Sequence, residues 1–457
     1  MASASGTPSL SRAELRSVFD KGNAEGCARE LVGIEVEAAA LDPVTGAAVP
    51  YGGESGVRAL LESLAAVPGA VPEYDRGALV GVRPKEGGAV SLEHGGAVEY
   101  SSPPAGCVAE LAEVSGRALR GLAERARRFG FALVPGGQYP FTSIEEVCWV
   151  PHSRTPLMRR HFARLGEAGV WGPRVMSMTL STQASFDFGS PADLGEKLRT
   201  QVAASTPAAA LFVNAPMEAG RPCGVLSRRM HYLSRTDPWR TRVIPVTLRE
   251  DFSVDHFIDW ALSLPMIHRS APDGGRRSAP PVPFGTLLTE GFEDGTRPDL
   301  RDWRAHLSQM FTDVRLRETL EMRAFDGPPF GAFAAVPAFW SGLTYHRPSR
   351  TAAWELLRGA GPRQHQEALD DIARRGLAAR FDGQPVREIA AELLRLSAEG
   401  LRARIEAGLE RPAALACLDP LHDVLATGAT FAERALALWR EEPASYPERF
   451  VAQHRIR

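Results

Sequence analysis

Five glutamates lie inside short apolar segments, where a folded chain normally places hydrophobic side chains. These residues are Glu35, Glu37, Glu93, Glu99 and Glu321. Residues 31–40 alternate like a strand, so Glu35 and Glu37 share one face while Ile34 and Val36 take the other. Carboxylates crowded into one pocket raise one another's pKa unless cations neutralise them. Hard divalent cations such as Mg²⁺ prefer oxygen ligands. If the five glutamates converge, the sequence predicts a metal site suited to phosphate chemistry; on open edge strands they would be ordinary surface charges.

Size and composition narrow the class of protein. The chain has 457 residues, of which 44% are hydrophobic and 24% are charged, and its formal net charge is −2. It can therefore bury a large core, and it has no basic field that would favour nucleic acid as a partner. We expect no membrane association, because no apolar run approaches the roughly 20 residues that cross a bilayer. Residues 1–10 are small and polar, which predicts a disordered tail rather than a signal peptide.

The cysteines favour a reducing compartment. There are five, with wide spacings and no CxxC pair, so neither a disulfide framework nor a zinc site is expected. We therefore predict a cytoplasmic protein.

The hydrophobic periodicity predicts helices and strands in a mixed order. A hairpin over residues 88–101, turned at Gly95 and Gly96, would place Glu93 roughly opposite Glu99. Residues 220–241 are irregular, and 272–283 have the composition of a mobile loop. Because the strands come from distant segments with helices between them, the fold class is α+β rather than a regular βαβ repeat. Helices are predicted over 10–30, 56–66, 108–129, 191–211, 255–264, 303–310, 333–343 and from about 350 onward, and strands over 31–40, 131–137, 175–188, 316–323 and from 266.

Other polar residues are candidates for binding. Arginine makes two-pronged contacts with carboxylate and phosphate. Arg323 shares a strand face with Glu321, and Gln183 and Asn214 stand in apolar segments, where they bind substrate or satisfy the core. The chain has no GxxxxGK[ST], no GxGxxG after a strand, no HExxH and no GxSxG, so ATP would be held through metal ions and arginines. Arg229, Arg235 and Arg240 are further candidates for anion binding, with solvated surface charge as the alternative, and surface charge is the expectation for Arg228. Ser181 binds substrate or satisfies the core. We interpret His94, His231 and His256 as structural or surface residues.

Seven segments in register resemble the plant and bacterial type of glutamate–cysteine ligase. They are Gly33-Ile-Glu-Val-Glu, Ser91-Leu-Glu-His-Gly-Gly-Ala-Val-Glu, Ser181-Thr-Gln-Ala-Ser-Phe-Asp-Phe, Leu211-Phe-Val-Asn-Ala-Pro, Leu226-Ser-Arg-Arg, Arg235-Thr-Asp-Pro-Trp-Arg-Thr and Leu320-Glu-Met-Arg-Ala-Phe-Asp. The resemblance runs from about residue 30 to 345, and the C-terminal part is also similar. It implies a glutamine-synthetase-like fold, with a curved antiparallel sheet that forms an open funnel backed by helices. The implied catalytic domain spans residues 11–345, and a helical part over 346–457 packs on it.

The resemblance also implies ligands and roles. The ligands are glutamate, ATP and two or three Mg²⁺ ions, with Mn²⁺ as the alternative metal. The glutamate γ-carboxylate would attack the γ-phosphate of ATP, and an acceptor amine would then displace phosphate from the γ-glutamyl phosphate. The metal ligands would be the five glutamates. Arg323 and Glu321 would be catalytic, Arg229, Arg323 and Asn214 would bind ATP, and Gln183, Arg229, Arg240, Met178 and Leu233 would lie at the substrate.

Three positions depart from the family pattern, and they leave the acceptor open. Met178 replaces an arginine, Leu233 replaces a tryptophan and Arg242 replaces a glycine of the plant enzymes. We expect cysteine as the acceptor, in glutathione or ergothioneine synthesis; the alternatives are another amine or a non-catalytic relative.

The assembly would be a monomer or a homodimer. Residues 138–160 or 270–285 would close over the intermediate. Glu35→Gln or Glu321→Gln should abolish turnover and leave the metal-free fold intact or slightly more stable.

Overall fold

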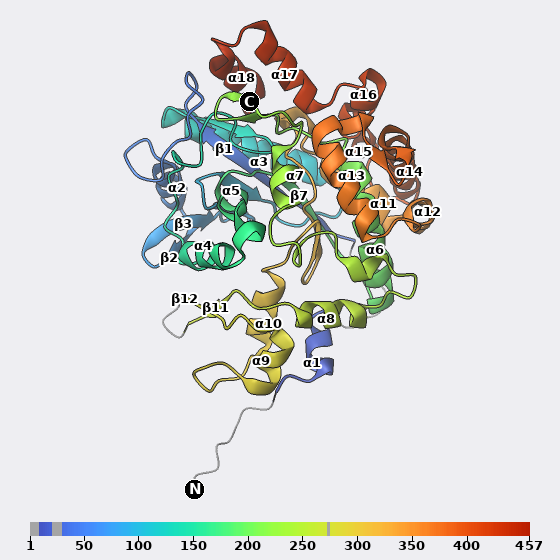
Figure 1. Cartoon of the computed structure of the whole chain (residues 1–457). Coiled ribbons are helices and arrows are strands. Elements are labelled where there is room, and N and C mark those ends of the chain that lie inside the picture. The colour runs from blue at the N-terminus through green and yellow to red at the C-terminus, as the bar shows by residue number, and fades with distance from the viewer. Residues whose placement is uncertain (1–8, 21–29, 272–274) are drawn as a thin grey trace.

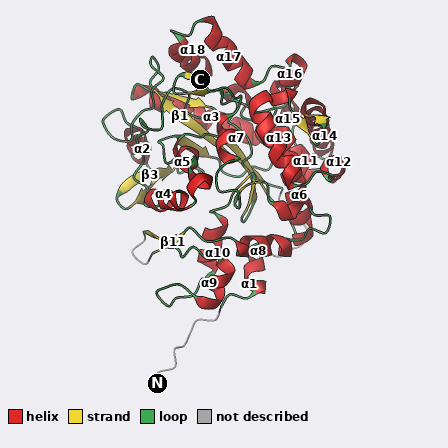
Figure 2. Cartoon of the chain, in the orientation of Figure 1, coloured by secondary structure: helices red, strands yellow, loops and turns green. Residues whose placement is uncertain are grey.

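The centre of the molecule is a nine-stranded antiparallel sheet. The computed structural model describes residues 9–20, 30–271 and 275–457, so most of the predicted N-terminal tail lies outside the described residues. The strand order is β14-β15-β7-β1-β5-β4-β3-β2, and β6 pairs with β1. Figure 2 shows the strands gathered in the middle of the molecule. The nine strands are β1 Val32–Leu41, β2 Val71–Asp75, β3 Ala78–Arg83, β4 Ala89–Leu92, β5 Val98–Ser101, β6 Ala132–Pro135, β7 Thr182–Phe186, β14 Val314–Leu316 and β15 Leu320–Met322.

Strand β1 divides the molecule into an apolar side and a polar side. Ile34 and Val36 are buried in the main hydrophobic cluster, and helices α3 (Val108–Arg128) and α11 (Ala335–Tyr345) pack against this strand. Glu35 and Glu37 point to the opposite face, where they line a cavity. The alternation in the sequence therefore sets which side of the sheet is functional.

The turn of the β4–β5 hairpin depends on two glycines. Gly96 has φ of 87°, a conformation that glycine adopts without a steric penalty. A Cβ on Gly95 would lie 1.9 Å from the backbone oxygen of Ser177, so only glycine lets the turn contact helix α5 (Gly172–Ser177) this closely. The contact fixes the hairpin, and with it Glu93 and Glu99, against the rest of the cavity wall.

Helices of the C-terminal part lie beside the sheet, with α17 and α18 at one end (Figure 1). Helix α14 packs on α11, and α12 packs on α6. One hydrophobic cluster contains residues from Leu15 to Ile456. The other helices are α1 Arg12–Ser17, α2 Val57–Ala65, α4 Thr155–Arg164, α6 Pro191–Ala209, α7 Arg228–Leu233, α8 Val254–Ser263, α9 Phe284–Glu290, α10 Leu300–Leu307, α12 Arg347–Leu357, α13 Pro362–Arg375, α14 Val386–Glu406, α15 Ala413–Ala416, α16 Asp419–Thr427, α17 Phe431–Glu441 and α18 Tyr446–His454.

Four short ladders complete the fold. The pair β11–β12 forms a hairpin beside α10, and β10 pairs in parallel with β13. Their bounds are β8 Met217–Glu218 with β9 Arg221–Pro222, β10 Thr241–Arg242 with β13 Phe311–Thr312, β11 His268–Ser270 with β12 Arg276–Ser278, and β16 Arg380–Phe381 with β17 Gln384–Pro385. Across the described ranges no helix is both long and apolar enough to span a bilayer.

The predicted fold class is confirmed, but several predicted elements are wrong in detail. Residues 175–188 are the end of α5 followed by the shorter strand β7. Residues 316–323 belong to two strands, because Arg317 donates its N–H to Thr319 and the chain reverses there. Residues 220–241 contain α7, and the β2–β3 hairpin was not predicted. Of the helix predicted over 10–30, only α1 falls among the described residues, because 21–29 lie outside them.

Candidate functional site

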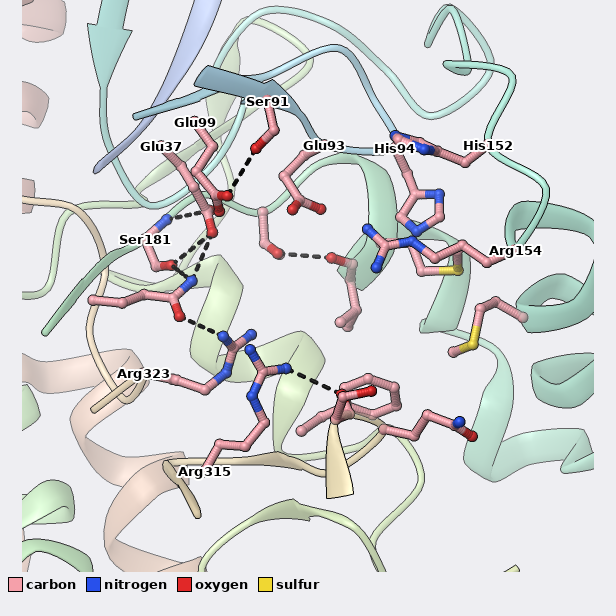
Figure 3. A pocket seen from close by; sticks show the side chains of 18 of the residues that line it. Glu37, Ser91, Glu93, His94, Glu99, His152, Arg154, Ser181, Arg315 and Arg323 are labelled. Atoms are coloured by element: carbon pink, nitrogen blue, oxygen red, sulfur yellow. Dashed lines mark hydrogen bonds between the residues drawn. The ribbon is translucent and has the colours of Figure 1, made fainter. Parts of the chain in front are cut away.

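Four of the five predicted glutamates line one cavity of about 560 Å³ on the polar face of the sheet. We call Glu35, Glu37, Glu93 and Glu99 the acidic wall; Figure 3 labels Glu37, Glu93 and Glu99. Strand pairing brings them together: Glu37 lies directly opposite Glu99. Glu99 also lies opposite Ser91, whereas Glu93 pairs with Ala97, two residues nearer the turn. Glu93 and Glu99 are therefore diagonal neighbours rather than a facing pair.

Crowding changes the acidity of this wall. Burial and the charge of Glu321 raise the pKa of Glu35 to about 7. Burial and the neighbouring Glu93 raise the pKa of Glu37 to about 7, and burial together with Glu35 raises that of Glu99 well above its ordinary value. These carboxylates are thus strongly biased toward protonation until a cation joins them.

Hydrogen bonds hold the deepest carboxylate in place. The backbone N–H of Ser181 donates to Glu37 at 2.7 Å, and the Ser181 hydroxyl donates at 3.1 Å. The amide of Gln183 donates to the same carboxylate at 2.8 Å, and Ser91 donates to Glu99 at 3.0 Å. Gln183, which the sequence assigned to the substrate, lines the cavity and orients Glu37.

The fifth glutamate has a different environment. Arg315 donates two hydrogen bonds to the Glu321 carboxylate, at 2.8 and 2.7 Å, and Arg323 donates a third at 2.6 Å. We call Arg315, Glu321 and Arg323 the arginine clasp. Burial alone would raise the pKa of Glu321, but the two arginines outweigh it and lower the pKa to about 2. Glu321 does not line the cavity, whereas Arg315 and Arg323 do.

The arginines predicted from the sequence separate into two groups. Arg323 and Arg229 line the cavity; Arg323 also donates to Gln183, and Arg229 donates to the backbone oxygen of Arg323 at 2.8 Å. Burial lowers the pKa of Arg229 to about 10. Arg240, by contrast, is 2% exposed and is paired with Asp237 at 2.9 Å outside the cavity lining. Its position gives no support for the predicted substrate contact.

Further predicted residues also lie elsewhere. Met178 packs in a small hydrophobic cluster with Ala39 and Leu180, and Asn214 donates to the backbone oxygen of Gly327 at 2.8 Å. Neither lines the cavity, so the structure does not support a substrate role for Met178 or an ATP contact for Asn214. Arg228 pairs with Glu218, Arg235 pairs with Asp370, His231 packs beside Trp171, and His256 bonds to Ser253.

Sequence reasoning missed one side of the cavity. His152, Arg154, His268 and Arg276 line it and come from the loop before α4 and from the β11–β12 hairpin. Burial lowers the pKa of His152, and it lowers that of His268 to about 3. These loops have no hydrophobic period, and the one signal they carry is a high density of His and Arg.

A family model settles the relationship. The model of glutamate–cysteine ligase family 2 matches residues 31–452, which is most of the chain. The chain belongs to this family. The resemblance predicted from the seven segments is therefore confirmed, and the acidic wall and Arg323 come from three of those segments.

Relatives and a solved structure agree with this family assignment. The chain is 30% identical over 357 residues to the chloroplastic glutamate–cysteine ligase of Arabidopsis thaliana, covering 77% of this chain and 66% of that protein. It is 30% identical over 354 residues to the chloroplastic glutamate–cysteine ligase B of Oryza sativa subsp. japonica, covering 77% and 69%. The chain thus spans about two thirds of the length of these relatives. The glutamate–cysteine ligase of Francisella tularensis, solved in complex with AMP, has the same fold, with a TM-score of 0.56, 12% identity, and coverage of 93% and 88%.

Two departures from the family lie at or near the cavity. Leu233 lines it. Arg242 is 3% exposed and has φ of 71°, the left-handed region where glycine is favoured, which accounts for a glycine at this position in the plant pattern. Its side chain lies 3.2 Å from Asp313, and its guanidinium nitrogens have no hydrogen-bond partner.

The donor set fits divalent cations. The acidic wall offers carboxylate oxygens of the kind that Mg²⁺ binds, and its raised pKa values indicate charge that lacks neutralisation. No three carboxylate, imidazole or thiol groups of the described residues are close enough together to share one ion. Binding would therefore require these side chains to move closer together.

Proposed function

We propose that this protein is an ATP-dependent ligase that joins the γ-carboxylate of glutamate to the amine of an amino acid, with cysteine as the expected acceptor. The observation that carries the proposal is the meeting of the acidic wall with Arg229 and Arg323 in one cavity. A non-catalytic relative would have lost one of these groups. All of them are present, and a cavity of this size falls in the range of small-molecule sites.

The acidic wall would hold the metal. Glu35, Glu37, Glu93 and Glu99 would bind Mg²⁺, which when bound neutralises phosphate oxygens and aligns them for transfer. Glu321 would act through its neighbours, because both of its oxygens accept from guanidinium groups. It would keep Arg315 and Arg323 charged and pointed at the cavity.

The chemistry needs alignment more than a protein nucleophile. A γ-carboxylate oxygen of glutamate attacks the γ-phosphorus of ATP, the bond to the bridging oxygen breaks, and ADP leaves. The acceptor amine then attacks the acyl carbon of γ-glutamyl phosphate, inorganic phosphate leaves with the bonding pair, and the amine loses a proton. Arg229 and Arg323 would hold the anionic oxygens through both steps.

Water must be kept from the acyl phosphate. Parts of both segments predicted to close over the intermediate border the cavity: His152, Arg154 and Met158 from one, and Arg276 from the other. We propose that one of the two segments closes over it when substrates bind.

An ADP-release assay tests the function. With Mg²⁺, ATP and glutamate, the purified protein should release ADP on addition of cysteine, and mass spectrometry should detect γ-glutamylcysteine. Glu37→Gln is the matched inactive variant. A faster rate with another amine would replace cysteine as the acceptor, and Leu233 and Arg242 motivate that second candidate. No glutamate-dependent ADP with any amine would contradict the proposal.

A cysteine acceptor would place the protein in glutathione or ergothioneine synthesis. The compartment, which we predicted to be cytoplasmic, and the assembly, predicted to be a monomer or homodimer, remain predictions. The two relatives named above are chloroplastic proteins.

A further inference from the structure

A second positively charged part of the cavity is not used by the steps above. Arg154 directly precedes α4, and Arg276 is the first residue of β12. Both line the cavity, and Arg154 lies beyond Glu93 as seen from Glu37 and Glu99 (Figure 3). The two guanidinium groups interact, because after burial the charge of Arg154 is the next cause that lowers the pKa of Arg276. We call Arg154 and Arg276 the arginine pair.

The arginine pair makes no direct ion pair in the described part of the protein. Among the described residues no carboxylate lies within ion-pair distance of either guanidinium, and the buried Nε of Arg154 has no hydrogen-bond partner. The charge of Asp75 acts on Arg276 without a direct ion pair, and Asp75 itself accepts from the backbone N–H of Ser153 at 2.7 Å and lies 3.7 Å from His152. Two adjacent arginines in a partly desolvated cavity are unfavourable without an anion, so the arrangement indicates an anionic ligand.

An apolar stripe begins at this pair. Met158 and Phe162 follow Arg154 at intervals of four residues, so all three lie on one side of α4. Both line the cavity together with Met176, and Met158 and Phe162 are 5% and 2% exposed. The apolar stripe favours a short apolar or sulfur-containing group and disfavours a charged one, which would lose its hydration there.

The arginine pair and the apolar stripe together fit one class of ligand. A nucleotide phosphate is matched by metal ions on the acidic wall and by Arg229 and Arg323, and it gains nothing from the apolar stripe. An amino acid has a carboxylate for the arginines and a side chain for the stripe. Resting on the proposed function, we infer that the arginine pair binds the α-carboxylate of the acceptor amino acid, and that the stripe selects acceptors with a short apolar or thiol side chain.

The test compares acceptors with and without a carboxylate. Cysteine and cysteamine share the thiol and the amine, but only cysteine has the carboxylate. Arg154→Gln should lower kcat/KM for cysteine by about 10- to 100-fold, the loss expected for a charge-assisted contact. It should leave kcat/KM for cysteamine nearly unchanged, and so remove the preference of the wild type for cysteine. Aspartate and lysine should be poor acceptors for both proteins.

A matched control separates this role from helix stability. Arg160→Gln removes an exposed arginine from the same helix and should change neither acceptor. Arg154 makes no side-chain cap bond to α4, so its variant should fold, which circular dichroism checks. An equal loss for cysteine and cysteamine would overturn the inference. So would a rise in KM for ATP or glutamate instead of cysteine, which would assign the pair to phosphates or to the donor.

Calorimetry distinguishes failure of the inference from failure of the proposed function. Cysteine should bind to the wild type without ATP, and more weakly to Arg154→Gln. If this difference appears but no ADP is released, the subsite is supported and the proposed function is wrong. If glutamate-dependent ADP release occurs but cysteine binds equally to both proteins, the subsite is wrong and the proposed function stands.

Discussion

The acidic wall and the arginine clasp place the same residue type on one sheet face with opposite results. Glu37 lies in the acidic wall, where burial and the charge of Glu93 raise its pKa to about 7. Glu321 faces Arg315 across another pair of strands, and its pKa falls to about 2. Both side chains are almost fully buried, at 7% and 5% exposed. Burial alone therefore does not set the charge of a glutamate here, because the sign of the neighbouring charges decides it.

The difference assigns different tasks to the two regions. The acidic wall holds negative charge that the protein leaves uncompensated, as a site for cations requires. In the arginine clasp the charge of Glu321 is already neutralised, so this region adds structural rigidity and presents two guanidinium groups to the cavity. Exchanging or removing single charges should therefore have separable effects on activity and on stability.

The largest expected effect is on turnover. Glu37→Gln should lower kcat by about 1000-fold, because it removes a carboxylate that the proposed metal requires. The free energy of unfolding without metal should stay the same or rise, since a repulsive charge is lost. ADP release and urea unfolding measure the two quantities. A variant with near-normal kcat would show that the acidic wall is not the metal site.

Glu321→Gln should instead reduce stability. It leaves Arg315 and Arg323 buried without their carboxylate, which costs about 4 kcal/mol of unfolding free energy. This replaces the expectation, drawn from the sequence, that the variant would be as stable as the wild type. The matched control is Glu318→Gln in the turn of the same hairpin, whose exposed pair with Arg304 is worth less than about 1 kcal/mol. Equal urea midpoints for the two variants would contradict the clasp.

Stability should also depend on pH in a way that identifies the acidic wall. The pKa of Glu37 is about 7 in the folded protein and 4.5 ordinarily, so between these values the folded state binds more protons than the unfolded state. Glu37 alone should therefore reduce the stability of the metal-free protein by up to about 3 kcal/mol as pH rises from 4.5 to 7. Glu37→Gln should flatten this profile in thermal or urea unfolding. A wild type whose stability rises steadily across that range would show that these carboxylates are not strained.

The sequence predicted the acidic wall well, because alternation in short strands determines which side chains share a face. This alternation alone predicted that Glu35 and Glu37 lie on the opposite face of the strand from Ile34 and Val36. The arginine clasp was only half predicted: Arg323 shares a strand with Glu321, but Arg315 meets it across a reversal at Arg317. Leu316, Leu320 and Met322 keep the same alternation on both sides of that turn, so the local pattern is typical of one strand.

The arginines show a second limit. Arg229 and Arg240 occur in similar polar segments, yet one enters the cavity and the other is paired with Asp237. That choice depends on tertiary contacts that no local pattern contains. The same is true of Arg154 and Arg276, which irregular segments far apart in the chain bring into one cavity.

The most direct test of the central claim is a Mn²⁺ titration followed by electron paramagnetic resonance. Free Mn²⁺ gives a strong signal that weakens on binding, so the wild type with ATP should remove ions from solution, and Glu37→Gln should bind them much more weakly. The Glu318→Gln control should behave like the wild type. Equal Mn²⁺ binding by the wild type and Glu37→Gln would contradict the assignment of the acidic wall as the metal site.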